Sequence, residues 1–417
     1  MNERLLILLS FIQYRWFSRF TTLRALRQHQ RRLLKRQLAF VKAKSPFYRN
    51  KSSLPIMDKN TFMEQFEAVN TVQITRKSAL DFALACEQTR EFSKKLRGVT
   101  VGLSSGTSGN RGIFLVSDRE RALWAGAMLA KTLPKGHLWG VRIAFFMRAN
   151  SELYQTIQSP FIEFRFFDML GDMEAALGAL GAYQPTILVA PPSCLLQIAK
   201  WNRSGQINPR KVISIAEVLE DTDATTIRKA FGISVVHQVY QCTEGFLGTT
   251  CEYGTLHLNE DLIKVEKEYL DDRRFIPIIT DLKRRAQPII RYRLNDILVE
   301  KAQSCPCGSV FTALEEIEGR QDDVFEFAGA TGTVAVYPDF IRRCLLLVEE
   351  VGEYRVQQLS ASEVAILADN LSEESKRQIT NQFQNLARTS HFIMPDLIFK
   401  PYEYNSSRKL KRVEKLC

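Results

Sequence analysis

Small hydroxyl side chains and glycines dominate one short stretch, residues 101–112, which reads Val-Gly-Leu-Ser-Ser-Gly-Thr-Ser-Gly-Asn-Arg-Gly. Glycines let the backbone turn tightly and aim successive N–H groups inward, and the hydroxyls add donors without bulk. Such a loop can hold a phosphate group. Its spacing is neither the Walker pattern nor the dinucleotide fingerprint, so by itself the stretch is equally consistent with a plain flexible turn.

Two other polar runs could act on the same kind of ligand. Tyr240-Gln-Cys-Thr-Glu244 is placed just past a strand-like run, and a carboxylate beside a hydroxyl can hold Mg²⁺ next to phosphates. Residues 280–296 contain Arg291, which could face a phosphate, and Asp296, which could accept hydrogen bonds from ribose hydroxyls. The alternative for residues 280–296 is a surface strand with salt bridges.

The C-terminal quarter carries a candidate hinge and a basic tail. Glu318-Gly-Arg320-Gln-Asp322 falls where the sequence pattern changes, which makes it a natural hinge. The run around Lys409 is basic. Such a tail is normally just solvated, but a lysine on a mobile domain can also reach into a cleft as a point charge.

Four residues form a candidate metal site: Cys251, His257, Cys305 and Cys307. Three thiols and an imidazole make a closed tetrahedral zinc set, which leaves no open position and predicts a structural role. The alternative is that Cys251 and His257 are unrelated core residues. Eight cysteines without a regular framework spacing suit a reducing, cytoplasmic environment.

The elements that must position these groups follow from the periodicity. Strand-like and helix-like runs alternate over residues 141–240, which predicts a mostly parallel α/β sheet whose functional groups gather where strands end. Residues 255–300 are more typical of antiparallel strands. From about residue 323, short strands and a polar helix over residues 373–387 predict a small α+β domain. We therefore expect three parts, residues 1–50, 51–320 and 321–417.

The first part is a basic amphipathic helical arm. Residues 1–51 hold 13 Lys and Arg and one acid, a net charge of +12, whereas the other 366 residues hold 44 basic and 45 acidic side chains. The high pI therefore does not indicate a nucleic-acid enzyme. A helix packed on the main domain with a solvated basic face is the simplest interpretation. The alternative is a surface that docks an anionic partner, either a membrane face or an acyl-carrier protein.

In this order and spacing the motifs resemble the adenylate-forming superfamily, and within it the branch of the phenylacetate–CoA ligases and coenzyme-F (CoF) synthetase-related enzymes. The likeness spans roughly residues 40–412. The motifs that carry it are Ser104-Ser-Gly-Thr-Ser-Gly109, Tyr240-Gln-Cys-Thr-Glu244, Pro288-Ile-Ile-Arg-Tyr-Arg-Leu-Asn-Asp296, Gly319-Arg-Gln-Asp322 and Arg408-Lys-Leu-Lys.

The resemblance implies a large N-terminal α/β domain that binds ATP and the acyl-adenylate, followed by a small mobile α+β lid. It implies a two-step ligase reaction. A carboxylic acid, which we expect to be aryl or otherwise apolar, attacks the α-phosphate of ATP and releases pyrophosphate. A thiol such as coenzyme A then displaces AMP. The alternatives are an adenylyltransferase of the coenzyme-F synthetase type, and a non-catalytic zinc-stabilised interaction protein that binds an acidic partner.

The resemblance also implies roles for single residues. Thr243 contacts the α-phosphate, Glu244 holds Mg²⁺, and Lys409 bridges carboxylate and phosphate during adenylation, with Arg291 as a further catalytic candidate. Asp322 is the hinge. Some phenylacetate-ligase relatives carry a structural zinc at a similar cysteine cluster. The expected nucleotide-binding residues are Ser104, Ser105, Gly106, Thr107, Ser108, Gly109, Arg111, Glu217, Tyr240, Asp296, Arg320 and Asp322.

At three places the sequence departs from the family pattern, and we expect these changes to affect the reaction rate and the second half-reaction without removing the ATP site. The usual Pro-Lys after the loop is Asn110-Arg111, the adenine-side Gly-Gly-Glu is Ile215-Ala-Glu217, and Arg408 stands where relatives usually have Gly. For the acid pocket we expect an aromatic lining that includes Phe145, Phe146 and Tyr154.

Overall fold

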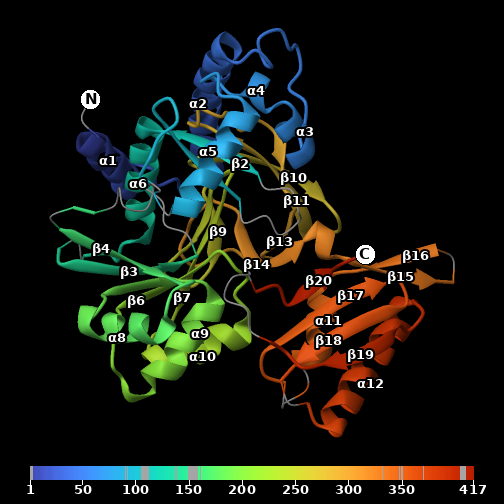
Figure 1. Cartoon of the computed structure of the whole chain (residues 1–417). Helices are drawn as coiled ribbons and strands as arrows, with labels where there is room; N and C mark the ends of the chain where they lie inside the picture. Colours follow the sequence, from blue (N-terminus) through green and yellow to red (C-terminus); the bar gives the residue numbers. More distant parts are fainter. Residues whose placement is uncertain are drawn as a thin grey trace. The chain divides into compact units, whose positions relative to one another are not determined.

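The computed structural model describes residues 3–403 and 410–417, apart from residues 90, 92, 105–111, 137–138, 149–157, 160, 331, 347, 349–350 and 370. The chain divides into two compact units (Figure 1). The larger unit comprises Met1–Leu294 and Val299–Glu316, and the smaller unit comprises Asn295–Leu298 and Ile317–Cys417. The expected division at residues 50 and 320 stays a prediction.

A 12-stranded sheet runs through the larger unit, and its strand order is β10-β11-β13-β14-β9-β8-β7-β6-β5-β3-β4, with β12 paired to β11. From β7 to β4 all neighbours are parallel. The predicted parallel α/β sheet is therefore confirmed. Its strands are β3 (Val141–Met147), β4 (Ile162–Asp168), β5 (Ile187–Ala190), β6 (Lys211–Ile215) and β7 (Val236–Cys242).

Both faces of this parallel half are covered, which explains why its strands are almost continuously apolar. Ala144 and Phe146 pack in a core with α8 (Met173–Tyr183), α9 (Pro192–Trp201) and α10 (Asp221–Phe231). Ile143 and Phe145 point the other way, into a core with α6 (Asp118–Thr132). Phe146 is fully buried and stacked on Phe167. The expectation that Phe146 lines an acid pocket is therefore wrong, because strand alternation turns its ring into the core under α8, α9 and α10. A place for Phe145 in the acid pocket stays a prediction, and Tyr154 lies outside the described residues.

In the other half of the sheet the pairs β7–β8, β8–β9, β9–β14, β10–β11 and β11–β12 are antiparallel, as predicted for residues 255–300. Two strands of this half, β8 and β14, were not predicted. The boundary between the two units runs through β13 and β14. The strands of this half are β8 (Gly245–Thr250), β9 (Leu256–Leu258), β10 (Ile263–Tyr269), β11 (Arg274–Asp281), β12 (Tyr292–Arg293), β13 (Asp296–Glu300) and β14 (Ala313–Arg320).

A separate hairpin of β1 (Val99–Leu103) and β2 (Ile113–Ser117) leads directly into α6. Ser117 begins α6 through a capping box, in which its hydroxyl accepts from the Glu120 N–H and the Glu120 carboxylate accepts from the Ser117 N–H. Asp58 caps α3 (Lys59–Glu64), because its carboxylate accepts from the Thr61 N–H. The remaining helices before β1 are α4 (Phe66–Val69) and α5 (Arg76–Thr89).

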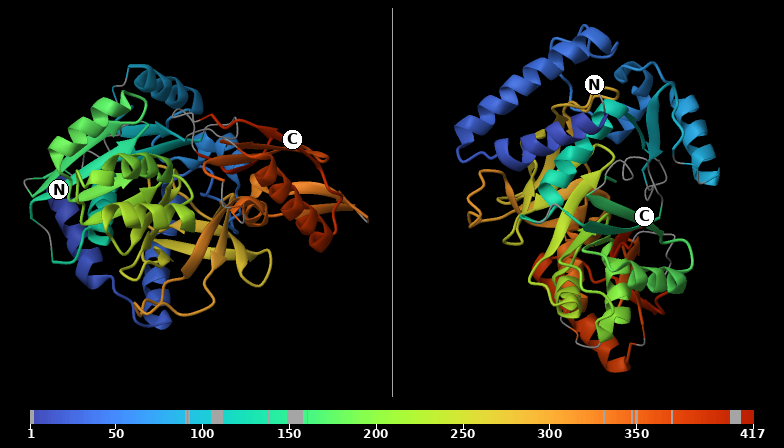
Figure 2. Two further views of the ribbon diagram at one scale, coloured as in Figure 1. Left: turned by 90° about the horizontal axis from the view of Figure 1, so that it is seen from below. Right: turned by 90° about the vertical axis from the view of Figure 1, so that its left-hand side faces the viewer.

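The predicted helical arm consists of α1 (Glu3–Ile12), a π-helical turn (Gln13–Phe17) and α2 (Leu23–Lys44). Figure 2 shows both helices at the edge of the larger unit, with α1 lying along α6. No helix in the described part of the chain is long and apolar enough to cross a membrane.

The smaller unit is α+β, as predicted. A four-stranded sheet with the order β19-β18-β17-β20 shares one core with α11 (Pro338–Leu346) and α12 (Glu373–Ser390). The hairpin of β15 (Phe325–Gly329) and β16 (Gly332–Val336) packs on the same core. The sheet strands are β17 (Tyr354–Ser360), β18 (Glu363–Ala368), β19 (Asp396–Lys400) and β20 (Val413–Lys415), and short 3₁₀ turns occupy Asn202–Ser204 and Gln321–Asp323.

Candidate functional site

The Ser/Gly stretch connects the two strands of the β1–β2 hairpin, whose register pairs Leu103 with Ile113. Two hydrogen bonds close the base of this connection: the Ser104 N–H donates to the Gly112 carbonyl at 2.7 Å, and the Gly112 N–H donates to Ser104 Oγ at 2.7 Å. Ser104 thus anchors the loop. The other predicted loop residues lie outside the described residues: Ser105, Gly106, Thr107, Ser108, Gly109 and Arg111.

The second motif lies at the β7–β8 hairpin. The strand β7 continues to Cys242, so Tyr240 lies within the strand and not past it, and only Thr243 and Glu244 occupy the turn. The Thr243 hydroxyl donates to Glu244 Oε2 at 2.8 Å. Tyr292 hydrogen-bonds Glu244 from β12, and burial together with this carboxylate raises the pKa of Tyr292 far above its usual value, so the phenol stays protonated.

One pocket brings the two motifs together. Gly112, at the end of the Ser/Gly loop, lines it together with Thr243 and Glu244, which lie 131 and 132 positions further along the chain. The other lining residues are Lys59, Phe62, Met63, Ile113, Arg284, Gln287, Ile289 and Tyr292. The Glu244 carboxylate and the cationic side chains of Lys59 and Arg284 around one pocket suit a phosphate-bearing ligand and its metal ion.

Arg284 is a member of this pocket that the sequence analysis did not single out. Its Nη1 donates to the Thr243 carbonyl at 2.5 Å, and its Nη2 donates to Gln287 Oε1 at 2.8 Å. Gln287 in turn bonds both Ile113 and Leu115 of β2, through its Nε2 at 3.0 Å and its Oε1 at 3.0 Å. Arg284 therefore links the turn after β7 to the strand after the loop.

The third nitrogen of this guanidinium, Nε, is buried and has no hydrogen-bond partner among the described residues. A buried cationic donor of this kind costs free energy unless it is matched, so an anion in the pocket would satisfy it. Lys59 and Tyr292 were also missed. No local signal separates these residues from their neighbours, because only the tertiary fold brings them to Glu244.

Arg291, the predicted catalytic arginine, lies in a different environment. Its guanidinium pairs with Glu266 Oε2 at 2.9 Å and donates to the Leu54 carbonyl at 2.9 Å. Its backbone is left-handed, with φ of 47°, and its N–H donates to the Thr280 hydroxyl at 3.0 Å. The residues that line the described pocket include Arg284 and not Arg291. A catalytic role for Arg291 stays a prediction.

Glu217, predicted on the adenine side, is buried in an ion pair. Its Oε1 accepts from Arg148 Nη2 at 2.9 Å and its Oε2 accepts from the Ser193 hydroxyl at 2.7 Å. Its side chain is 1% exposed. The structure therefore gives this carboxylate a role in joining the ends of β3, α9 and β6, and contact with a nucleotide stays a prediction.

Three predicted residues lie close together in the smaller unit. Arg320 Nε is 3.9 Å from Asp296 Oδ1, and the Asn295 amide donates to the Asp322 carboxylate. The Gln321 N–H also donates to the Asn295 carbonyl, at 2.7 Å. The predicted hinge is thus tied to the residues beside Asp296. Lys409 lies outside the described residues.

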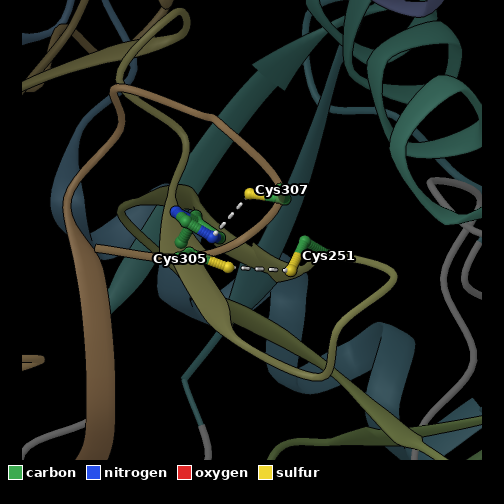
Figure 3. A group of neighbouring side chains, drawn as sticks. Cys251, Cys305 and Cys307 are labelled. Carbon is green, nitrogen blue, oxygen red and sulfur yellow. Dashed lines mark hydrogen bonds between the residues drawn. The ribbon is translucent and has the colours of Figure 1, made fainter. Parts of the chain in front are cut away.

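The four predicted zinc ligands meet in the larger unit, with all four ligand atoms within 4.8 Å of one another. Figure 3 shows the thiols of Cys251, Cys305 and Cys307 pointing into one cluster. Cys251 Sγ is 3.6 Å from Cys305 Sγ, and Cys307 Sγ is 3.4 Å from His257 Nε2. A tetrahedral zinc with Zn–S bonds of about 2.3 Å separates two thiolates by about 3.8 Å, so this donor set fits. His257 Nδ1 faces the Phe311 carbonyl at 3.2 Å, which orients the ring.

No family model matches the sequence, and no curated protein matches it either. Solved structures do resemble it. 2-Hydroxyisobutyryl-CoA ligase, in complex with 2-HIB-AMP in the postadenylation state, has 17% identity and a TM-score of 0.68 over 93% of this chain and 88% of that chain. The amide bond synthetase McbA from Marinactinospora thermotolerans has 13% identity and a TM-score of 0.56 over 76% of this chain and 68% of that chain.

The anthranilate CoA ligase AuaEII, in complex with anthranoyl-AMP, has 13% identity and a TM-score of 0.51 over 75% of this chain and 66% of that chain. All three are adenylate-forming enzymes. At these identities the likeness shows the fold, and the chain has the fold of the adenylate-forming enzymes. The phenylacetate–CoA ligase branch stays a prediction.

Proposed function

We propose, starting from the adenylate-forming fold, that this protein activates a small-molecule carboxylic acid with ATP as an acyl-adenylate and then transfers the acyl group to a thiol such as coenzyme A. The observation that carries the proposal is the pocket in which the end of the Ser/Gly loop meets Thr243, Glu244 and Arg284. Two of the similar structures hold an AMP adduct of their acid, 2-HIB-AMP and anthranoyl-AMP.

Repulsion between two negatively charged reactants opposes the proposed reaction. In the first step a carboxylate oxygen attacks the α-phosphorus, the bond to the bridging oxygen breaks, and pyrophosphate leaves with the electron pair. In the second step a thiolate attacks the acyl carbon and AMP leaves. Because acid and nucleotide are both anions, alignment and charge neutralisation supply most of the rate enhancement.

Within the pocket each group has a defined task in this proposal. The loop that begins at Ser104 holds the β- and γ-phosphates. Glu244 holds Mg²⁺, which neutralises phosphate charge, and Thr243 contacts the α-phosphate. Arg284, held against the Thr243 carbonyl, donates its free Nε–H to a phosphate oxygen. The protonated Tyr292 fixes the Glu244 carboxylate through a hydrogen bond.

The remaining assignments rest on the motif resemblance. Tyr240 and Glu217 contact the adenine, Asp296 binds the ribose hydroxyls with Arg320 nearby, Asp322 is the hinge of the small domain, and Lys409 bridges the reacting groups. We also propose that Cys251, His257, Cys305 and Cys307 hold a structural zinc, which the fit of the donor set supports. A closed four-ligand site has no position for a substrate.

Pyrophosphate release from ATP and Mg²⁺, measured with a panel of aryl and fatty acids, tests the function. We expect release with one acid class, loss of release in Lys409→Ala, and no loss in the exposed control Lys200→Ala. Addition of coenzyme A should then produce AMP. ATP binding without release for any acid would overturn acid activation and favour an adenylyltransferase. The absence of ATP binding would favour a non-catalytic interaction protein.

A further inference from the structure

Large apolar side chains are exposed over the first helix and the turn after it. Leu5, Leu8 and Leu9 follow one face of α1 and are 45–52% exposed, and Trp16 and Phe17 in the π-helical turn are 50% and 76% exposed. With Leu23 they make six of the sixteen exposed large hydrophobic residues described, all within 19 residues of sequence. We call these six residues the apolar edge. A cluster this dense marks an interaction surface and is not ordinary scatter.

The apolar edge is held in place by packing elsewhere on the arm. Ser10 Oγ donates to the Leu123 carbonyl at 2.7 Å, and Arg15 donates to three carbonyls at the end of α6, those of Ala130, Leu133 and Pro134. Leu6 and Tyr14 are buried. The inward residues therefore fix α1 on the larger unit, and Trp16 adds an edge-on contact with Phe11 at 5.6 Å between ring centroids.

Basic side chains continue from this edge along α2. Arg24, Arg27, Arg31 and Lys35 are exposed and recur at helical spacing, so they lie on one face, opposite the buried Leu26, Gln37 and Val41. Figure 2 shows α1 and α2 meeting at an angle at the edge of the larger unit. Along the chain, Trp16 and Phe17 come seven residues or fewer before Leu23, with which the basic helix α2 begins.

We infer that the apolar edge and the basic stripe of α2 dock on the surface of an anionic lipid bilayer. Leu, Trp and Phe enter the boundary between headgroups and acyl chains, while arginines meet the negative surface potential. A fluid interface accepts side chains spread around the corner between two helices, whereas a protein partner would need a matching concave surface. This inference goes beyond the proposed function and does not depend on it.

Sedimentation of the full-length protein with phosphatidylcholine vesicles, with and without 30% phosphatidylserine, tests the inference. We expect binding to the anionic vesicles at 50 mM NaCl and weaker binding at 500 mM. Trp16→Ser with Phe17→Ser should lower the partition coefficient at least about tenfold. Arg24→Gln, Arg27→Gln and Arg31→Gln together should lower it on the order of 100-fold, since each arginine near the surface contributes about fivefold.

Two control variants carry the same kinds of substitution at exposed positions outside α1, the π-helical turn and α2. Ile393→Ser with Leu416→Ser removes two exposed apolar side chains, and Lys77→Gln, Lys200→Gln and Arg203→Gln remove three exposed charges. Both controls should bind as the wild type does. No binding of the wild type, or equal binding by the Trp16/Phe17 variant, would overturn the inference. Equally tight binding to soluble polyglutamate, insensitive to Trp16 and Phe17, would do the same and indicate an acidic protein partner.

Discussion

Arg284 shows how a single side chain joins motifs that are distant in sequence. Its two Nη atoms donate hydrogen bonds to the Thr243 carbonyl and to Gln287 Oε1. Gln287 in turn hydrogen-bonds the backbone of both Ile113 and Leu115. The guanidinium therefore links the β7–β8 turn to β2, and its buried Nε has no hydrogen-bond partner among the described residues. The two donations, one to a backbone carbonyl and one to a side-chain oxygen, use the planar fork of arginine, which lysine lacks.

We predict that Arg284→Gln lowers the rate of acid-dependent pyrophosphate release by about 10²–10³-fold, the effect of losing one well-placed donor to developing charge. Arg284→Lys should be almost as impaired, because it keeps the charge and loses the fork. The matched control is Arg285→Gln, whose guanidinium lies over the Phe40 ring at 4.5 Å and does not line the pocket. Unchanged release in Arg284→Gln, with the fold intact, would remove Arg284 from the proposed site.

At the scale of elements, the contact between α1 and α6 depends on one glycine. A Cβ built on Gly126 would lie 2.4 Å from the Ile7 carbonyl oxygen and 2.6 Å from Ser10 Cβ. Those atoms are backbone or close to it, so they cannot rotate away. The helices approach this closely only because residue 126 has no side chain.

We predict that Gly126→Ala lowers the free energy of unfolding by about 1–3 kcal/mol, since it overpacks the contact. Gly178→Ala in α8 is the matched control, because its Cβ would meet nothing within 4 Å. That change should instead stabilise the protein by about 0.5–1 kcal/mol through helix propensity. Urea unfolding followed by tryptophan fluorescence suits both variants, and a neutral Gly126→Ala would contradict the rigid packing of α1.

The cysteine cluster brings together residues from two separate connections of the large sheet. Cys251 lies just after β8 and His257 is in β9, while Cys305 and Cys307 lie in the connection from β13 to β14. A metal held by all four residues would pin this connection to the β8–β9 turn. An ion that binds the folded state and not the unfolded state stabilises the folded state by mass action.

We predict one zinc per chain by elemental analysis and a lower thermal midpoint after removal of the metal with a chelator. Cys307→Ser should lose the metal and show the same lowered midpoint, with no further effect of the chelator. Cys417→Ser, which changes an exposed thiol outside the cluster, should keep both metal and midpoint. Stoichiometric zinc in Cys307→Ser would show that the metal binds elsewhere.

Local patterns predict most elements of this fold and miss those that depend on distant partners. The strands β3 to β6 and most of β7 fall within residues 141–240, where alternating strands and helices are predicted, because buried strands are short, apolar and bounded by turns. The strand β20 has only three residues and forms by pairing with β17, some 57 positions away. Likewise, four arginines lie between residues 284 and 293. Only tertiary contacts place Arg284 at Thr243 and Arg291 at Glu266.

At the scale of the whole molecule, the response to pH depends on basic groups inside the larger unit. Burial lowers the pKa of two of them, His237 and Lys211. His237 lies in β7, where burial, aided by the nearby Lys211 ammonium, lowers the pKa of the imidazole to about 4. The same burial lowers the pKa of Lys211 to about 8. Its Nζ donates to the Thr132 carbonyl at 2.7 Å. Glu252 partly offsets both effects.

His237 should make the larger unit sensitive to acid. Its pKa is about 4 when folded and near 6.5 when unfolded, so between these values the unfolded chain binds the extra proton. Stability is therefore present above pH 6.5 and is lost as the pH falls towards 4, by about 3 kcal/mol from this group. His237→Asn cannot be charged and should lose correspondingly less stability over that range.

Tryptophan fluorescence isolates this effect, since all four tryptophans lie in Met1–Leu294 of the larger unit. Urea midpoints of the wild type and His237→Asn, measured from pH 7 to pH 4, should diverge progressively below pH 6.5. His391→Asn changes an exposed histidine in the smaller unit, at a left-handed position that Asn tolerates, and should follow the wild type. A histidine that is buried without charge must oppose folding once the unfolded chain can bind its proton. Parallel curves for the wild type and His237→Asn would therefore contradict the prediction and mean that carboxylates alone cause the loss of stability in acid.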